Sequence, residues 1–204
     1  MNSKKIIAYQ GSSGSYSEEL LKKEYPDYLY HPTETFTELI SYVKSDSGIG
    51  LLPVENSIAG TVNEAYEELI DSGLKIFAEY VHRIDHSLIG LVGSDISNHE
   101  ENYTRFLLIG DIDLDQKQIK NKVSSVLISD DKPGSLLQSL NIFSELDINL
   151  TKLESRPILG RPWEYKFYID YELENLEKQS ELEEKINKVS KEFKLLGHYP
   201  KALQ

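Results

Sequence analysis

The stretch Ile6-Ile7-Ala8-Tyr9-Gln10-Gly11-Ser12-Ser13-Gly14-Ser15 begins with four apolar residues and continues into a loop of glycine and serine. A short apolar run bounded by turn residues predicts a buried strand. Ser15 and Glu18 have the spacing of a capping box, so we expect a helix that carries Leu20 and Leu21 to begin here. A strand, a tight loop and a helix in this order begin a β-α-β unit and indicate an α/β fold.

The same capping spacing recurs twice in the first half of the chain. Thr35 with Glu38, and Thr61 with Glu64, each precede apolar residues at helical spacing, so two more helices are expected. Between them, residues 48–54 predict a short strand that ends at Pro53. Further strands are expected at residues 74–81, 86–92 and 105–109.

A second series of elements follows a polar stretch. Residues 111–122 have little to bury and predict a linker. Strands are then expected at residues 125–129, 148–153, 165–171 and 193–196. One helix is expected to begin at Pro133, and a second helix is expected near residues 180–191. The order β-α-β-β-α-β is the ferredoxin-like arrangement. We therefore predict two domains, 1–110 and 123–204.

Composition restricts the function classes. The 204 residues are 39% hydrophobic, which is enough for a core, and 34 acidic against 22 basic residues give a net charge of -12. Nucleic acids and anionic membranes both favour a basic surface, so neither is expected as a partner. No stretch approaches the roughly 20 apolar residues of a membrane span. The first residues are basic, but the apolar run that follows them is too short for a signal peptide. A cytoplasmic location is therefore expected.

Metal and nucleotide sites have little support. The absence of cysteine excludes disulfides and thiolate ligands. Of the five histidines, His82 and His86 are four residues apart, but they lie where strand and turn are expected, so they need not share a face. No zinc-protease or P-loop pattern occurs. We therefore expect no metal and no cofactor.

Three polar loops could carry chemistry, and each has a plainer alternative. Residues 11–15 could bind an anion at a helix start, or could form only a tight turn. Glu55, Asn56 and Ser57 lie at the carboxyl end of a predicted strand, where ligands of α/β sheets gather, but these residue types also form turns and caps. Thr104 and Arg105 place a hydroxyl and a guanidinium at the edge of a strand, where Thr104 could be an ordinary strand hydroxyl.

Taken jointly, these loops resemble prephenate dehydratases. The first half carries, in the order of that family, Tyr9-Gln10-Gly11, Gly14-Ser15-Tyr16-Ser17, Leu52-Pro53-Val54-Glu55-Asn56-Ser57-Ile58-Ala59-Gly60-Thr61-Val62 and Asn102-Tyr103-Thr104-Arg105-Phe106. The second half adds Lys132-Pro133-Gly134-Ser135-Leu136, Ile148-Asn149-Leu150-Thr151-Lys152, Glu154-Ser155-Arg156-Pro157 and Leu196-Gly197-His198-Tyr199-Pro200, which are similar to the ACT regulatory domain of that family. The resemblance covers nearly the whole chain. It implies a lobe like those of periplasmic binding proteins at residues 1–110, followed by a ferredoxin-like ACT domain.

The resemblance also implies a reaction and a site. Prephenate would lose water and carbon dioxide to give phenylpyruvate, in the biosynthesis of phenylalanine. Thr104 matches the catalytic threonine of the family and would donate a hydrogen bond or a proton to the departing hydroxyl. Arg105 would bind a substrate carboxylate, and Asn56 would fix the orientation. The other expected substrate contacts are Gln10, Gly11, Ser13, Glu55, Ser57 and Phe106, and main-chain N–H groups of the loop at residues 11–15 are expected to bind the second carboxylate.

The ACT-like half implies an effector. Phenylalanine would be bound by residues around a helix start and around a strand end, with Gly134 allowing a close approach of the backbone. The expected contacts are Gly134, Ser135, Leu136, Asn149, Leu150, Glu154, Ser155, Arg156 and Pro157. Because such domains pair through their sheets, a homodimer or homotetramer is expected.

One departure from the family pattern leaves a second hypothesis open. The family has a whole second lobe between the segments that correspond here to residues 91–95 and to Asn102, whereas this chain has only a short connection at about residues 93–103. A half-open site leaves its charged groups in water, where Coulomb attraction is weaker. The alternative function is therefore a phenylalanine-binding regulatory protein that retains one catalytic lobe with impaired activity.

Overall fold

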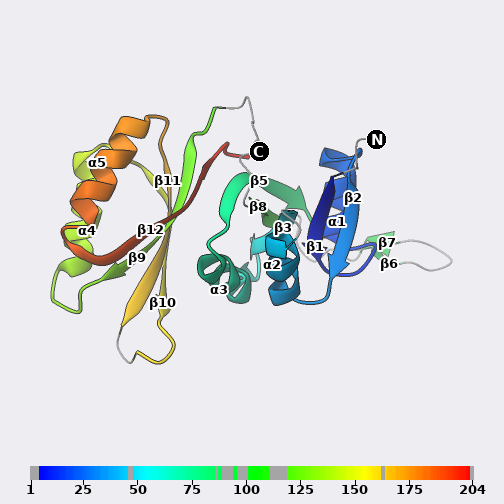
Figure 1. The fold of residues 1–204 in the computed structure, drawn as a ribbon, viewed down its shortest axis with the longest axis horizontal. Coiled ribbons are helices and arrows are strands. Elements are labelled where there is room, and N and C mark those ends of the chain that lie inside the picture. Colours follow the sequence, from blue (N-terminus) through cyan, green and yellow to red (C-terminus); the bar gives the residue numbers. More distant parts are fainter. Residues whose placement is uncertain are drawn as a thin grey trace. The chain divides into compact units, whose positions relative to one another are not determined.

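The computed structural model describes residues 5–45, 48–85, 87–88, 94–95, 101–110, 119–161 and 164–202. It divides the chain into two compact units, Met1–Asp115 with Ala202–Gln204, and Gln116–Lys201 (Figure 1). The sequence predicts domains at 1–110 and 123–204. Most of the linker predicted between them, residues 111–118, lies outside the described residues, so its conformation stays a prediction.

The first unit is built on one mixed sheet with the strand order β2-β1-β3-β8-β5, and β4 pairs with the end of β3. Its strands are β1 (Ile6–Gln10), β2 (Leu29–Thr33), β3 (Ile49–Asn56), β4 (Gly60–Thr61), β5 (Lys75–Arg83) and β8 (Tyr103–Gly110). β1 is parallel to β2 and β3, whereas β8 is antiparallel to both β3 and β5. The carboxyl ends of β1, β3 and β5 therefore meet the amino end of β8 at one edge of the sheet. A separate hairpin pairs β6 (Ser87–Leu88) with β7 (Ser94–Asp95).

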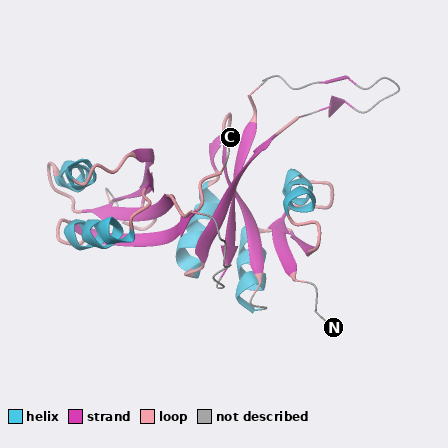
Figure 2. Ribbon diagram, turned by 90° about the horizontal axis from the view of Figure 1, so that it is seen from above, coloured by secondary structure: helices cyan, strands magenta, loops and turns pink. Residues whose placement is uncertain are grey.

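Helices cover both faces of this sheet (Figure 2). α1 (Tyr16–Glu24) contributes Leu20 and Leu21 to a core that includes Tyr9, Leu51 and Phe106. α2 (Phe36–Ser45) packs against the other face at Gly50, where an added Cβ would lie 2.8 Å from Val43 Cγ2. The glycine therefore lets α2 approach closely, since a Cβ here would force side chains of α2 to shift. The third helix is α3 (Asn63–Ser72).

Three local predictions for this unit were wrong. α3 begins at Asn63 with Val62 as its N-cap, and Thr61 lies in β4 opposite Glu55, so Thr61 and Glu64 form no capping box. β3 does not end at Pro53 but continues to Asn56, because a register shift next to Pro53 accommodates the missing N–H group. β2 was missed, since an edge strand with a mostly exposed sequence lacks the apolar signal.

The second unit has the predicted order β-α-β-β-α-β. Its elements are β9 (Lys122–Ser129), α4 (Ser135–Glu145), β10 (Leu150–Pro157), β11 (Tyr165–Glu172), α5 (Leu176–Ile186) and β12 (Ser190–Tyr199). The antiparallel sheet has the order β10-β11-β9-β12, and both helices pack on one face, where Val123, Leu127 and Ile169 meet Phe143 and Leu182. The ferredoxin-like prediction is confirmed. α4 begins two residues later than Pro133, at Ser135.

No helix within the described ranges is long and apolar enough to cross a membrane. The strand that we expected at residues 86–92 lies mostly outside those ranges. So does most of the short connection at residues 93–103, and the absence of a second lobe there stays a prediction.

Candidate functional site

Asn56 and Thr104 face each other across β3 and β8. Asn56 Nδ2 donates to Thr104 Oγ1 at 3.1 Å, while Asn56 Oδ1 accepts from the main-chain N–H groups of Ile58 at 3.0 Å and Ala59 at 2.9 Å. A main-chain N–H group can only donate, so these two bonds fix which end of the amide points toward Thr104. The Thr104 oxygen therefore accepts from Asn56, and its own hydrogen remains for another acceptor.

The loop after Asn56 is fastened to the beginning of β8. The Ser57 hydroxyl donates to the Glu101 carbonyl and accepts from the Tyr103 N–H, both at 2.9 Å. Asn56 Nδ2 also lies 2.8 Å from Asn102 Oδ1. Ser57, predicted as a substrate contact, thus uses its hydroxyl within the protein, and it holds the two segments that carry Asn56 and Thr104.

The glycine-rich loop binds an anion that belongs to the protein itself. Gly14 N–H donates to Glu18 Oε2 at 2.8 Å, and the Ser13 hydroxyl donates to the same oxygen at 3.2 Å. The Gly14 N–H, followed by the Lys22 ammonium group, lowers the pKa of Glu18 below its ordinary value. Gly11 N–H donates to the Thr33 carbonyl. The N–H groups of Gly11 and Gly14 are therefore engaged, and the expectation that this loop binds a substrate carboxylate is not supported at these two positions.

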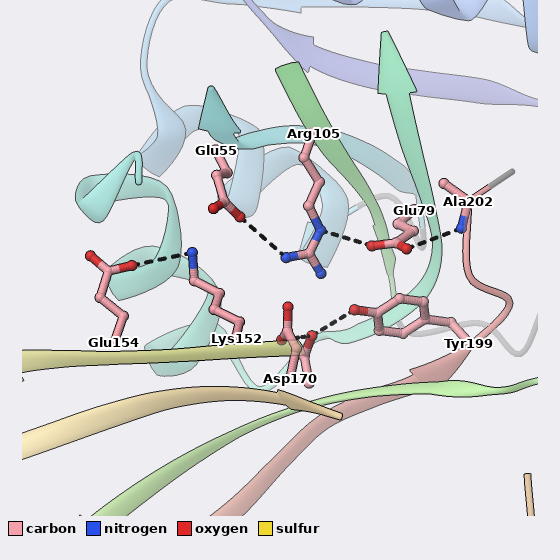
Figure 3. Close-up of polar contacts among 9 residues, drawn as sticks. Glu55, Glu79, Arg105, Lys152, Glu154, Asp170, Tyr199 and Ala202 are labelled. Carbon is pink, nitrogen blue, oxygen red and sulfur yellow. Dashed lines mark hydrogen bonds and ion pairs between the residues drawn. The ribbon is translucent and has the colours of Figure 1, made fainter. Parts of the chain in front are cut away.

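Arg105 lies on the face of the sheet opposite to Thr104, since successive residues of a strand point to opposite faces. Its Nε donates to Glu79 Oε2 at 2.8 Å, and its Nη1 lies 3.5 Å from Glu55 Oε2 (Figure 3). Phe106, on the Thr104 face, is buried in the core. The structure therefore does not bring Arg105 beside Thr104, and the predicted contacts of Arg105, Glu55 and Phe106 with substrate do not follow from this geometry.

Two further side chains complete this edge of the sheet. Gln10, at the end of β1, donates weakly to the Glu34 carbonyl at 3.4 Å. His82 on β5 lies opposite Thr104, and its Nε2 is 3.6 Å from Glu19 Oε1. Sequence reasoning missed His82 as a neighbour of Thr104, because only the register of β5 with β8 places them together. Among the described residues there is no cluster of three or more metal-ligating side chains.

In the second unit, Gly134 caps α4 in the left-handed conformation, with φ 82°. An added Cβ would meet no atom of this chain within 4 Å, so the close approach of the Gly134 backbone to a ligand stays a prediction. Within the chain itself the requirement for glycine is conformational. Leu136 and Leu150 pack beside the core on the helix-covered face, Ser135 is buried, and Asn149 is exposed just before β10.

The predicted effector contacts on β10 divide between the two faces of its sheet. Leu153 pairs with the core residue Ile169, so Leu153, Ser155 and Pro157 belong to the helix-covered face. Glu154 and Arg156 point to the other face, where they form an ion pair with each other. Ser155 and Pro157 therefore lie on the same face of the sheet as Leu150, whereas Glu154 and Arg156 lie on the other face.

The fold and the site together define a class of protein. It has an α/β unit with polar side chains at the carboxyl ends of its parallel strands, followed by a ferredoxin-like unit. The family model described as prephenate dehydratase matches residues 7–98. The structure of prephenate dehydratase from Streptococcus mutans is 32% identical, has a TM-score of 0.81, and is matched over 98% of this chain and 100% of that chain. The chain therefore belongs to the prephenate dehydratase family, a family of carbon–oxygen lyases.

Two other relatives extend the comparison. The prephenate dehydratase of Methanocaldococcus jannaschii is 28% identical over 269 positions, which cover 96% of this chain and 98% of the relative. Because this chain has only 204 residues, that alignment includes positions for which it has no counterpart. The Arthrobacter aurescens enzyme, solved in complex with L-Phe, has the same fold at 18% identity, with a TM-score of 0.81 over 95% of this chain and 89% of that chain.

Proposed function

We propose that this protein converts prephenate to phenylpyruvate, water and carbon dioxide. The observation that carries the proposal is the Asn56–Thr104 hydrogen bond of 3.1 Å, in which the threonine oxygen accepts. Thr104 then keeps its hydrogen for the substrate, as a donor to a departing hydroxyl must. This geometry favours the enzyme over the alternative of a regulatory protein with an impaired catalytic lobe.

The reaction balances without an electron carrier. The bond between the ring and its carboxylate breaks, carbon dioxide leaves, and the released electron pair completes the aromatic ring. The ring C–O bond breaks at the same time, and the departing hydroxide takes up a proton to become water. A threonine hydroxyl is too weak an acid to supply that proton itself, so Thr104 only donates a hydrogen bond to the departing oxygen. The proton comes from the solvent through a water molecule, which the solvent reprotonates.

We further propose that phenylalanine regulates the enzyme through the second unit. The amino end of α4 at Gly134 and Ser135 suits a carboxylate, and the apolar side chains of Leu136 and Leu150 suit a phenyl ring. Ser155, on the same face of the sheet as Leu150, can contribute a polar contact. The L-Phe complex of the Arthrobacter aurescens relative supports this ligand. β10 is an edge strand of its sheet, which suits the pairing of two copies of the chain. We also propose that the enzyme is cytoplasmic.

The test follows phenylpyruvate formation from prephenate by the purified chain. The parent is expected to exceed the acid-catalysed background, and Thr104→Ala is expected to lower kcat by about 100-fold or more. Thr104→Ser, which keeps the hydroxyl, is the matched control and retains most of the activity. Phenylalanine binding without turnover by the parent would instead support the regulatory protein.

A further inference from the structure

Arg105 belongs to a network of charged side chains that crosses three neighbouring strands of the first unit. Arg105 on β8 lies between Glu79 on β5, at 2.8 Å, and Glu55 on β3, at 3.5 Å (Figure 3). The side chains of Arg105 and Glu79 are 10% and 2% exposed, whereas that of Glu55 is 36% exposed. Charges this far from water interact more strongly than a surface pair, so the Arg105–Glu79 bond is the stronger of the two links.

The second oxygen of Glu79 is also bound. Glu79 Oε1 accepts from the main-chain N–H group of Ala202 at 3.0 Å, and Ala202 belongs to the same compact unit (Figure 3). A buried carboxylate is stable only when its oxygens have partners. With Arg105 on one oxygen and Ala202 on the other, the Glu79 carboxylate is fixed in place and in turn orients the guanidinium group.

This network lies one row away from the Asn56–Thr104 pair. Glu55 opposes Arg105 and Asn56 opposes Thr104 in successive positions of the β3–β8 register. A register shift between Pro53 and Glu55 comes directly before these rows. Such a shift interrupts the backbone hydrogen bonds between two strands, so their alignment is less firmly held there. The network ties all three strands together at the point where the hydroxyl of Thr104 must be placed.

We propose that Glu79 and Arg105 are positioning residues that hold Thr104 against Asn56, and that the Ala202 N–H group completes their network. The proposal rests on the function proposed above for Thr104. It assigns to Arg105 a role inside the sheet in place of the expected contact with a substrate carboxylate.

Steady-state kinetics of Glu79→Gln, Arg105→Met and the double variant test the assignment. Each single variant is expected to lower kcat by about tenfold or more, with KM changed by less than about twofold, because a positioning defect acts on the reacting geometry. The double variant is expected to be no slower than the slower single variant, since residues that act as one unit are not additive. A rise of about tenfold in KM for Arg105→Met, with Glu79→Gln unchanged, would show a substrate contact and overturn the proposal.

A backbone variant keeps the test valid if the charge variants fail to fold. Ala202→Pro removes the N–H group that Glu79 binds without changing either charged side chain, and Ala202→Gly, which keeps the N–H group, is the control. Ala202→Pro is expected to lower kcat by about threefold or more relative to Ala202→Gly, at unchanged KM. Equal kcat values for these two variants would remove Ala202 from the network.

An activity-independent measurement separates this proposal from the proposed function. In protein labelled at threonine methyl groups, the Thr104 resonance is identified by its loss in Thr104→Ser. Glu79→Gln is expected to shift that resonance, whereas Glu64→Gln, at an exposed position on α3, leaves it unchanged. A parent without turnover would refute the dehydratase alone, and an unmoved Thr104 resonance in Glu79→Gln would refute the positioning role alone.

Discussion

At the scale of single residues, the orientation of one amide decides what Thr104 can do. Asn56 Oδ1 is occupied by the N–H groups of Ile58 and Ala59, so Asn56 must act as a donor toward Thr104. The hydrogen of the threonine hydroxyl is thereby left for another acceptor, which in the proposed reaction is the substrate. A residue that accepts instead of donating at position 56 reverses this arrangement.

Asn56→Asp makes that change with almost no change in shape. One carboxylate oxygen can still accept from Ile58 and Ala59, but the other must accept the hydrogen of Thr104. We therefore expect kcat to fall by about 100-fold, as when one donor is removed from a transition state, in assays of phenylpyruvate formation. The added negative charge is also expected to raise KM for a dianionic substrate.

Asn56→Ala is the control for this experiment. It removes the donor but adds no acceptor, so Thr104 keeps its hydrogen and the variant is expected to retain more kcat than Asn56→Asp. Equal losses in the two variants would mean that the orientation of the Thr104 hydroxyl does not limit the reaction.

Sequence reasoning found the members of this site better than their roles. Sequence motifs predict Asn56, Thr104 and Arg105 as site residues, and Asn56 and Thr104 do lie together. The pairing of Arg105 with Glu79 could not be predicted, because it depends on the register between β5 and β8, two strands that are separated in the sequence. Strand alternation alone, however, already separates Thr104 from Arg105, and this signal was available.

At the scale of elements, the capping predictions succeeded only where the loop supplied matching geometry. Ser15 caps α1, and Glu38 N–H donates to Thr35 Oγ1 at the beginning of α2 at 3.1 Å. At Thr61 the same spacing failed, because pairing of β4 with β3 draws Thr61 into the sheet. Local spacing therefore predicts a helix start only when no tertiary partner competes for the same residue.

The cap of α1 makes stability depend on pH through Glu18. The pKa of Glu18 is lowered in the folded protein by the Gly14 N–H and by Lys22. The stability that the Glu18 carboxylate contributes is therefore fully present at pH values above the ordinary glutamate pKa of about 4.3. It is lost as the pH falls through the lower folded-state pKa. We expect Glu18→Gln to have a lower Tm than the parent at neutral pH, and the two Tm values to converge below about pH 4 in calorimetry.

Glu64→Gln serves as the matched control, since Glu64 also lies in the first turn of a helix but is exposed. Its Tm at neutral pH is expected to lie closer to that of the parent than the Tm of Glu18→Gln. If the profile of Tm against pH for Glu18→Gln runs parallel to that of the parent down to pH 3, the Glu18 carboxylate is not a stabilising cap.

At the scale of the whole molecule, two units of different architecture follow from two different hydrophobic patterns. The first unit buries both faces of its sheet, and α2 packs closely on the second face at Gly50, where an added Cβ would crowd the side chains of Val43 and Leu39. The second unit has its helices on one face only, as the predicted β-α-β-β-α-β order requires. The element order was therefore predictable, whereas the edge strand β2 was not, since it carries no apolar pattern.

The second unit is expected to bind L-phenylalanine, and the full chain should report this as a rise in Tm. A ligand that binds only the folded state stabilises it by mass action, by about 2.7 kcal/mol when its concentration is 100 times Kd. The rise should therefore grow with the logarithm of phenylalanine concentration. D-phenylalanine, which has the same ring and charges, is expected to cause a much smaller rise.

A pair of variants at Gly134 connects this binding to the amino end of α4. Gly134 has φ 82°, a conformation that asparagine tolerates and that a β-branched residue adopts only with strain. Gly134→Val is therefore expected to abolish the rise in Tm and the heat of binding in calorimetry, while Gly134→Asn retains both. The cause would be a displaced helix start, because an added Cβ itself meets nothing within 4 Å. If the parent shows no heat of binding and no rise in Tm in millimolar L-phenylalanine, the effector site is contradicted, whatever the dehydratase assay gives.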